Sequence, residues 1–155
     1  MKKNLVLLIL CFLFAQKALA ETTIPWTKEG CESVKGTWVT AHSATDEGCD
    51  AAHCNGVSFC QSPNTVTWWS AFTWCKGIGK KLVDLETACP NGLASSNTCA
   101  NLQNILPRRA WTNVPSGTRN AYGIASSKYN PDGGRTAPAI WERYKLNDVY
   151  ALCME

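Results

Sequence analysis

The sequence predicts an α+β domain stapled by disulfides, in which one main helix and a short second helix pack on antiparallel strands. Three observations carry this prediction. Residues 68–85 have the pattern of an amphipathic helix, a glycine stop and a short apolar strand. An even set of cysteines follows a secretory signal. Short alternating segments separated by turn residues fill the C-terminal part, as is typical of strands joined by turns.

Residues 1–20 are predicted to be a cleaved secretory signal. Lys2 and Lys3 precede an apolar run, and Ala18-Leu19-Ala20 is a small-residue cleavage motif, so cleavage is expected after Ala20. The apolar run is shorter than the roughly 20 residues that a membrane span needs. We therefore expect a secreted or periplasmic protein without a membrane span.

Removal of this signal changes the charge of the chain. Of the 15 Lys and Arg residues, Lys2, Lys3 and Lys17 lie in the signal, which contains none of the 12 Asp and Glu residues. The mature chain is therefore close to neutral. A neutral chain argues against nucleic acid or an anionic membrane as the partner.

The cysteines predict a disulfide framework. Cys11 lies in the signal, and the eight that remain form an even set on an exported chain. Cys89 and Cys99 flank a loop of Gly, Ser and Asn residues and are expected to pair with each other. Many connectivities are open for the other six.

Residues 21–56 are expected to form a disulfide-rich N-terminal elaboration, in front of a main domain at 57–155. Residues 36–40 and 57–60 have the composition and alternation of strands. Pro63-Asn64 is then expected to turn the chain toward the main helix.

The main helix is predicted to begin after Thr67, whose hydroxyl can accept an orphan backbone N–H. Gly77 and Gly79 are expected to end it, because glycine adopts a left-handed conformation at the lowest cost. The apolar face consists of residues at i, i+3, i+4 and i+7, namely Trp68, Ala71, Phe72 and Cys75.

The rest of the chain is predicted to be short strands around one further helix or turn. Leu82, Val83 and Leu85 indicate a strand directly after the main helix. The cysteine pair at 89 and 99 is expected to hold the short helix or turn that follows. Four more strands are predicted, at 110–112, 120–126, 137–144 and 148–154.

The pattern W-x-x-A-x-x-x-C-x-x-x-G-x-x-L-V over residues 68–83 resembles the first helix and following strand of C-type lectin-like domains. In that family the helix cysteine is bonded to a cysteine of the last strand, and the segment VYALCM at 149–154 supplies one. The resemblance implies a C-type lectin-like domain at 57–155, in a divergent bacterial secreted member of the superfamily. It also implies the bridge Cys75–Cys153, and the set would be completed by Cys49–Cys54 and Cys31–Cys60.

The predicted binding surface is the polar, Gly-rich segment between Trp111 and Trp141, with the residues that follow it. Aromatic side chains give rigid contact area there, and Arg and Asn give adaptable hydrogen bonds. In lectin-like domains the ligand face is built from this part of the chain. The alternative is that the aromatic residues are core and the segment only connects strands. The predicted ligand contacts are Arg119, Tyr129, Asn130, Asp132, Arg135, Glu142, Arg143, Asn147 and Asp148.

The resemblance also raises calcium-dependent sugar binding, for which the family uses two tripeptides of carboxylate and amide residues. Leu146-Asn147-Asp148 is similar to the second tripeptide but lacks its Trp, and Pro90-Asn91 lacks the Glu of the first. We therefore expect no cofactor, and we expect Asn147 and Asp148 to form a turn before the last strand.

Other chemistry has weaker support in the residues. His53 and the neighbouring Cys49 and Cys54 could suggest zinc, but thiols of an exported chain are expected to oxidise. An even disulfide set leaves no spare thiol as a nucleophile. Asp84 and Glu86 could form a glycosidase pair, although a strand edge or helix cap is the commoner role of such residues.

We therefore expect a non-catalytic binding module that recognises a glycan or protein at the bacterial cell surface. The alternatives are a minor subunit of a surface appendage or envelope assembly, and a small hydrolase. A receptor-like protein whose loop at 117–148 varies between gene copies is a further alternative.

Overall fold

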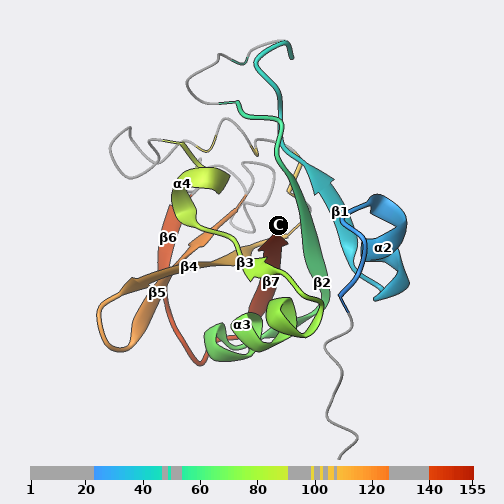
Figure 1. Ribbon diagram of the computed structural model, residues 1–155. Helices are drawn as coiled ribbons and strands as arrows, with labels where there is room; N and C mark the ends of the chain where they lie inside the picture. Colours follow the sequence, from blue (N-terminus) through green and yellow to red (C-terminus); the bar gives the residue numbers. More distant parts are fainter. Residues whose placement is uncertain are drawn as a thin grey trace, which may run out of the picture.

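The computed structural model describes residues 23–46, 49, 54–90, 99, 102, 105–106, 108–125 and 140–155. These residues form an α+β structure with one mixed seven-stranded sheet and three short helices (Figure 1). In chain order the elements are α2 (Lys28–Ser33), β1 (Thr37–Thr40), β2 (Ser58–Val66), α3 (Trp68–Gly77), β3 (Lys81–Leu82), α4 (Leu85–Ala88), β4 (Ala110–Ser116), β5 (Asn120–Ile124), β6 (Ile140–Tyr144) and β7 (Val149–Met154).

The last strand, β7, lies in the middle of the sheet, whose order is β1-β2-β7-β4-β5-β6, with β3 also paired to β7. β7 is antiparallel to β2 and parallel to β4, where Ala110 is opposite Tyr150. The prediction of antiparallel strands is therefore wrong for this pair. A hairpin would force antiparallel pairing, but β4 and β7 are connected through β5 and β6, so their directions are free to agree.

The main helix, α3, is capped as predicted. The Thr67 hydroxyl accepts a hydrogen bond from the Ser70 backbone N–H, and Gly79 adopts a φ of 74° just beyond the helix. Of the predicted apolar face, Phe72 is the exception, since it is 37% exposed. α3 lies at the lower end of the sheet in Figure 1 and packs against β7.

Two local predictions fail between α3 and the second helix. The strand predicted at 82–85 is only Lys81–Leu82, and Leu85 begins α4. The reason is Asp84, whose Oδ1 accepts the Thr87 backbone N–H at 2.7 Å and so starts a helix there. Asp84 is therefore a helix cap, one of the two structural roles expected for it.

The turn predicted at Pro63-Asn64 is also wrong, because β2 continues to Val66. Between the pairs Gln61↔Leu152 and Thr65↔Tyr150 the register shifts, so these residues form a bulge. Proline lacks an N–H and is tolerated at a bulge, where the ladder is interrupted in any case. The longer strand carries Thr65 to the beginning of β7.

The N-terminal segment joins the same sheet, since β1 pairs with β2 and forms an outer strand of the sheet. Its helix α2 was not predicted, although Thr27 caps it by accepting the Gly30 N–H at 3.1 Å. The Cys31–Cys60 bridge connects α2 to β2. Gly36 lies against this bridge, because a Cβ there would be 2.6 Å and 2.7 Å from its two sulfur atoms.

Two hydrophobic clusters lie on opposite faces of the sheet. Neighbouring residues of one strand belong to different clusters, for example Ala110 and Trp111, because strand side chains alternate between faces. Tyr122 and Ile124 share the first cluster, as expected of residues two apart on one strand. α3 and Trp111 belong to the second cluster, as does Val149, which also lines the pocket described below.

The eight cysteines form the four expected bridges, which are Cys31–Cys60, Cys49–Cys54, Cys75–Cys153 and Cys89–Cys99. Four disulfides indicate an oxidising compartment outside the cytoplasm. The predicted signal at 1–20 lies outside the described residues and stays a prediction. Within the described part of the chain, no helix combines the length and the apolar character that crossing a membrane requires.

Candidate ligand-binding pocket

A pocket of about 540 Å³ opens at the start of β7, beside the end of β2 and the start of β4. This volume is within the range of small-ligand sites. It is lined by Thr65 of β2, Arg108 and Arg109 before β4, Trp141 and Arg143 of β6, Leu146, Asn147 and Asp148 of the β6–β7 turn, and Val149 and Tyr150 of β7.

Strand pairing brings these distant segments together. Tyr150 is the central residue, because it lies opposite Thr65 on one side and Ala110 on the other. Its backbone N–H also donates to the Arg109 carbonyl at 3.3 Å. The pocket therefore depends on pairing between residues 40 or more positions apart in the chain.

The β6–β7 turn is held by a buried lysine. Lys145 is only 7% exposed, and its Nζ donates to the carbonyls of Gly117 and Thr118 at 3.2 and 3.3 Å. The same Nζ lies 4.4 Å from the centroid of the Trp68 ring, a favourable cation–π distance. These contacts position the turn that carries Asn147 and Asp148.

Trp141 forms one wall of the pocket. It lies opposite Gly123 of β5, and a Cβ on Gly123 would be 2.5 Å from Trp141 Cη2. Only glycine therefore lets the indole lie across β5, where its centroid is 5.7 Å from that of Trp111. Trp111 is fully buried, as expected of a core residue, whereas Trp141 is only half-buried and lines the pocket.

Each arginine of the pocket lies near an aromatic ring. The guanidinium of Arg108 is 5.1 Å from the ring centroid of Tyr150, and it donates to the hydroxyl of that residue. Those of Arg109 and Arg143 lie 5.8 Å and 5.5 Å from the Trp141 centroid. Aromatic contacts of this kind orient the planar guanidinium group.

The described lining of the pocket is positively charged, although residues 21–155 contain equal numbers of basic and acidic residues. Among the described lining residues, three are arginines and one, Asp148, is an acid. Within the described part of the chain, neither Arg108 nor Arg143 forms an ion pair with a carboxylate. The pocket therefore favours an anionic group.

Three of the predicted ligand contacts line this pocket, namely Arg143, Asn147 and Asp148. Asn147 also closes the expected turn, where its N–H donates to the Tyr144 carbonyl at 2.9 Å. Arg119 lies in the β4–β5 turn and Glu142 on β6, and neither is among the lining residues. Four predictions lie outside the described residues, namely Tyr129, Asn130, Asp132 and Arg135.

Sequence reasoning missed Arg108, Arg109 and Tyr150. The signal for the two arginines was their adjacency directly before a predicted strand. A near-zero charge summed over residues 21–155 does not report a local cluster of this kind. Tyr150 could have been found from alternation in β7, where Val149 and Ala151 belong to the second cluster and Tyr150 does not.

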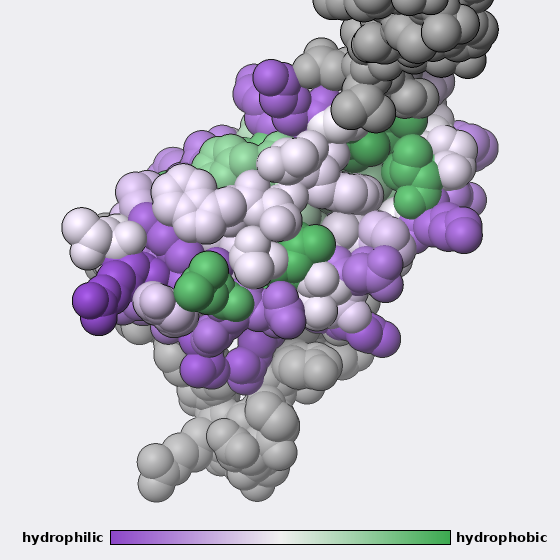
Figure 2. Space-filling model, turned by 90° about the horizontal axis from the view of Figure 1, so that it is seen from below, coloured by the Kyte–Doolittle hydropathy of each residue, from purple (hydrophilic) through white to green (hydrophobic). Residues whose placement is uncertain are grey.

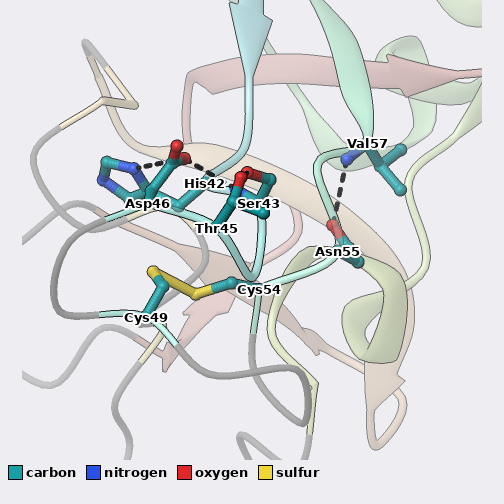
Figure 3. Close-up of polar contacts among 8 residues, drawn as sticks. All are labelled: His42, Ser43, Thr45, Asp46, Cys49, Cys54, Asn55 and Val57. Carbon is teal, nitrogen blue, oxygen red and sulfur yellow. Dashed lines mark hydrogen bonds and ion pairs between the residues drawn. A yellow bond between two sulfur atoms is a disulfide. The ribbon is translucent and has the colours of Figure 1, made fainter.

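A second polar group lies in the loop between β1 and β2 (Figure 3). Asp46 Oδ2 accepts the Ser43 backbone N–H at 2.7 Å and lies 3.3 Å from His42 Nδ1. The hydrogen bond from Ser43, with a smaller contribution from His42, holds the pKa of Asp46 below its usual range. The Ser43 hydroxyl pairs with Thr45 Oγ1 at 2.7 Å and not with the imidazole, so these residues do not form a Ser–His–Asp relay.

This loop is stapled by the Cys49–Cys54 bridge, so the two sulfurs are not thiolates able to bind zinc. Across the described residues, no group of three or more His, Cys, Asp or Glu side chains could hold a metal ion. We interpret the polar contacts of Figure 3 as structural contacts that order the loop.

Comparison with protein families and with curated proteins gave no significant match. The interpretation of the pocket therefore rests on its own geometry and charge.

Proposed function

We propose that this chain is a secreted, non-catalytic binding module with a C-type lectin-like fold, which recognises a glycan or a protein at the bacterial cell surface. The observation that carries the proposal is the pocket bounded by Trp141, Tyr150 and three arginines. A concave, partly aromatic site with a few oriented polar groups is the usual form of a recognition site.

Several features support the lectin-like fold. A main helix and a short second helix precede strands β4 to β7, as the resemblance implies. The last strand pairs with the strand before the main helix, and Cys75–Cys153 joins that helix to it. A scaffold bridged in this way can carry variable binding loops without losing its fold.

The residues of the pocket favour binding over hydrolysis. A glycosidase uses two carboxyl groups that flank the scissile bond, whereas the described lining contains one, that of Asp148. Asp84, the other acid considered for this role, caps α4 instead.

The same lining favours recognition without calcium. Ca²⁺ takes six to eight oxygen ligands, and several carboxylates normally supply part of them. Here the described lining has one carboxylate beside three guanidinium groups, which would repel a divalent cation. We therefore propose that ligand binding does not require calcium.

A role in an envelope assembly is the second candidate, because Trp69 and Leu146 are 58% and 61% exposed. Figure 2 shows the face seen from below, where strongly hydrophobic residues form separate patches among pale and hydrophilic residues. Stable subunit interfaces usually bury larger continuous apolar areas. The pocket therefore supports a binding module better than this face supports an assembly subunit.

The test of the proposal is a glycan-array screen of the oxidised mature protein, with calcium and again with chelator. We expect binding that is the same in both conditions. Loss of binding with chelator would restore a calcium site and contradict the proposed chemistry. No binding to glycans, combined with none to cell-surface protein extracts, would refute the binding function itself.

A further inference from the structure

We infer that the pocket recognises an acidic saccharide, whose anionic group is held by Arg143 and Arg108 while a sugar ring lies on Trp141. This inference deepens the proposed binding function and rests on it. It names a ligand class, which is a sugar that carries a carboxylate or a sulfate group.

The first step is the charge. Arg108 and Arg143 both line the pocket but come from different elements, one just before β4 and the other on β6. No described carboxylate neutralises either of them through an ion pair. A guanidinium presents its N–H donors in a planar fork that matches a carboxylate or sulfate in two parallel hydrogen bonds.

The second step is the aromatic wall. Gly123 lets the Trp141 indole lie across β5, and the neighbouring Trp111 supports it from within the second cluster. The C–H face of a pyranose ring is flat and apolar, so it packs on an indole by dispersion and burial of apolar area. Trp141 therefore offers a surface for the part of a sugar that an arginine cannot recognise.

The third step is an unused donor. Trp141 Nε1 is buried and has no hydrogen-bond acceptor among the described residues. Buried donors in proteins are normally paired, because an unpaired one has a free-energy cost. Because this N–H is closed to solvent, a ligand hydroxyl reaches it only if the indole shifts on binding.

The limited extent of the charge argues against a long polyanion. Glu142 lies next to Arg143 on β6, and Asp148 lines the pocket itself. Nucleic-acid binding needs a continuous basic stripe, whereas the arginines of this pocket are interrupted by these two acids. The combination of local charge with an aromatic wall fits a short acidic sugar better than an extended acidic chain.

The test uses calorimetric titration of the oxidised full chain. The probes are trigalacturonate, its methyl ester, a sulfated galactose trisaccharide and a short polyglutamate peptide. We expect the free acid or the sulfated sugar to bind at least about tenfold tighter than the neutral ester, as charge-assisted pairing implies. Which of the two binds tighter identifies the anionic group.

Two pocket variants and a control locate the site. Arg143→Gln and Arg108→Gln should each weaken binding of the acidic sugar about tenfold and leave the weak binding of the ester unchanged. Lys76→Gln removes one positive charge at a second pocket, which is lined by Phe72 and Lys81, and should change neither. Far-UV circular dichroism and a thiol assay confirm that each variant is folded and oxidised.

The outcomes separate the inference from the function. Equal affinity for acid and ester, unaffected by either arginine variant, would overturn the inference while the binding function stands. Tighter binding of polyglutamate than of any sugar would overturn it in favour of an acidic protein partner. If no probe binds and the array is also negative, both the inference and the glycan branch of the proposed function fail.

Discussion

Replacement of Gly123 by alanine should disturb Trp141 and little else. The new Cβ would lie 2.5 Å from Trp141 Cη2 and 2.6 Å from Cζ2. Carbon atoms in good contact are about 3.5–4.0 Å apart, so the indole must retreat by roughly 1 Å. The backbone itself does not oppose the change, because Gly123 is not among the glycines with positive φ.

Overpacking of this kind costs about 1–3 kcal/mol, and the entropy that alanine removes from the unfolded chain offsets about 0.4–1 kcal/mol. We therefore expect Gly123→Ala to lower the free energy of unfolding by roughly 1–2 kcal/mol. The assay is guanidinium unfolding of the oxidised protein, followed by far-UV circular dichroism. Gly77→Ala is a matched control, since a Cβ at that position would meet nothing within 4 Å beyond its own helix.

A double-mutant cycle with Trp141→Ala tests the cause. Without the indole the new methyl group has space, so Gly123→Ala should become neutral or slightly stabilising in that background. The expected coupling energy is at least about 1 kcal/mol. The same destabilisation in both backgrounds would refute the reasoning, because the cost would then come from the strand and not from the ring.

Four further outcomes are expected. Removal of the Cys75–Cys153 bridge, which spans 78 residues, should cost roughly 4–5 kcal/mol in the chain-entropy model, whereas removal of Cys49–Cys54, which spans 5, should cost only about 2, as measured by denaturant unfolding. Lys145→Met keeps the volume but leaves two turn carbonyls without their donor, so the melting temperature should fall by an amount equivalent to about 1–3 kcal/mol. The pKa of Asp46 is lower in the folded than in the unfolded chain, so the ionised carboxylate stabilises the fold at pH values above its unfolded pKa. This stabilisation should be lost as the pH falls through the folded pKa. The free energy of unfolding of Asp46→Asn, measured against pH, should lack that loss on the acid side. Asp148→Asn should raise the affinity for an acidic sugar severalfold in a titration, because it removes the one negative charge of the described lining.

The local features of the fold were predictable because their signals are local. Thr67 and Gly79 delimit α3 through cap geometry that depends on a few neighbouring residues. The Cys89–Cys99 bridge likewise follows from a short loop. The predictions at Leu85 and Pro63 failed because two local signals conflicted. At Leu85 the apolar run predicted a strand, but the Asp84 cap starts a helix. At Pro63 the residues predicted a turn, but they form a bulge within β2.

The candidate site was only partly predictable, for a different reason. Arg143 and Asp148 were found because they follow Trp141 closely in sequence. Arg108 and Tyr150 belong to the same pocket only through the parallel pairing of β4 with β7. No periodicity or spacing in one segment reports which distant strand will lie beside it, so residues contributed by long-range pairing escape sequence reasoning.

Asp148 decides between two chemistries of recognition, because they predict opposite signs for its substitution. In a calcium-dependent site an aspartate would be a metal ligand, and its conversion to asparagine would weaken or abolish sugar binding. In a site governed by arginines the same carboxylate repels an anionic ligand, so its conversion should strengthen binding. The effect should also diminish as the salt concentration rises, since an interaction between exposed charges is screened. The sign of one measured affinity change thus separates a calcium-dependent site from a site governed by arginines.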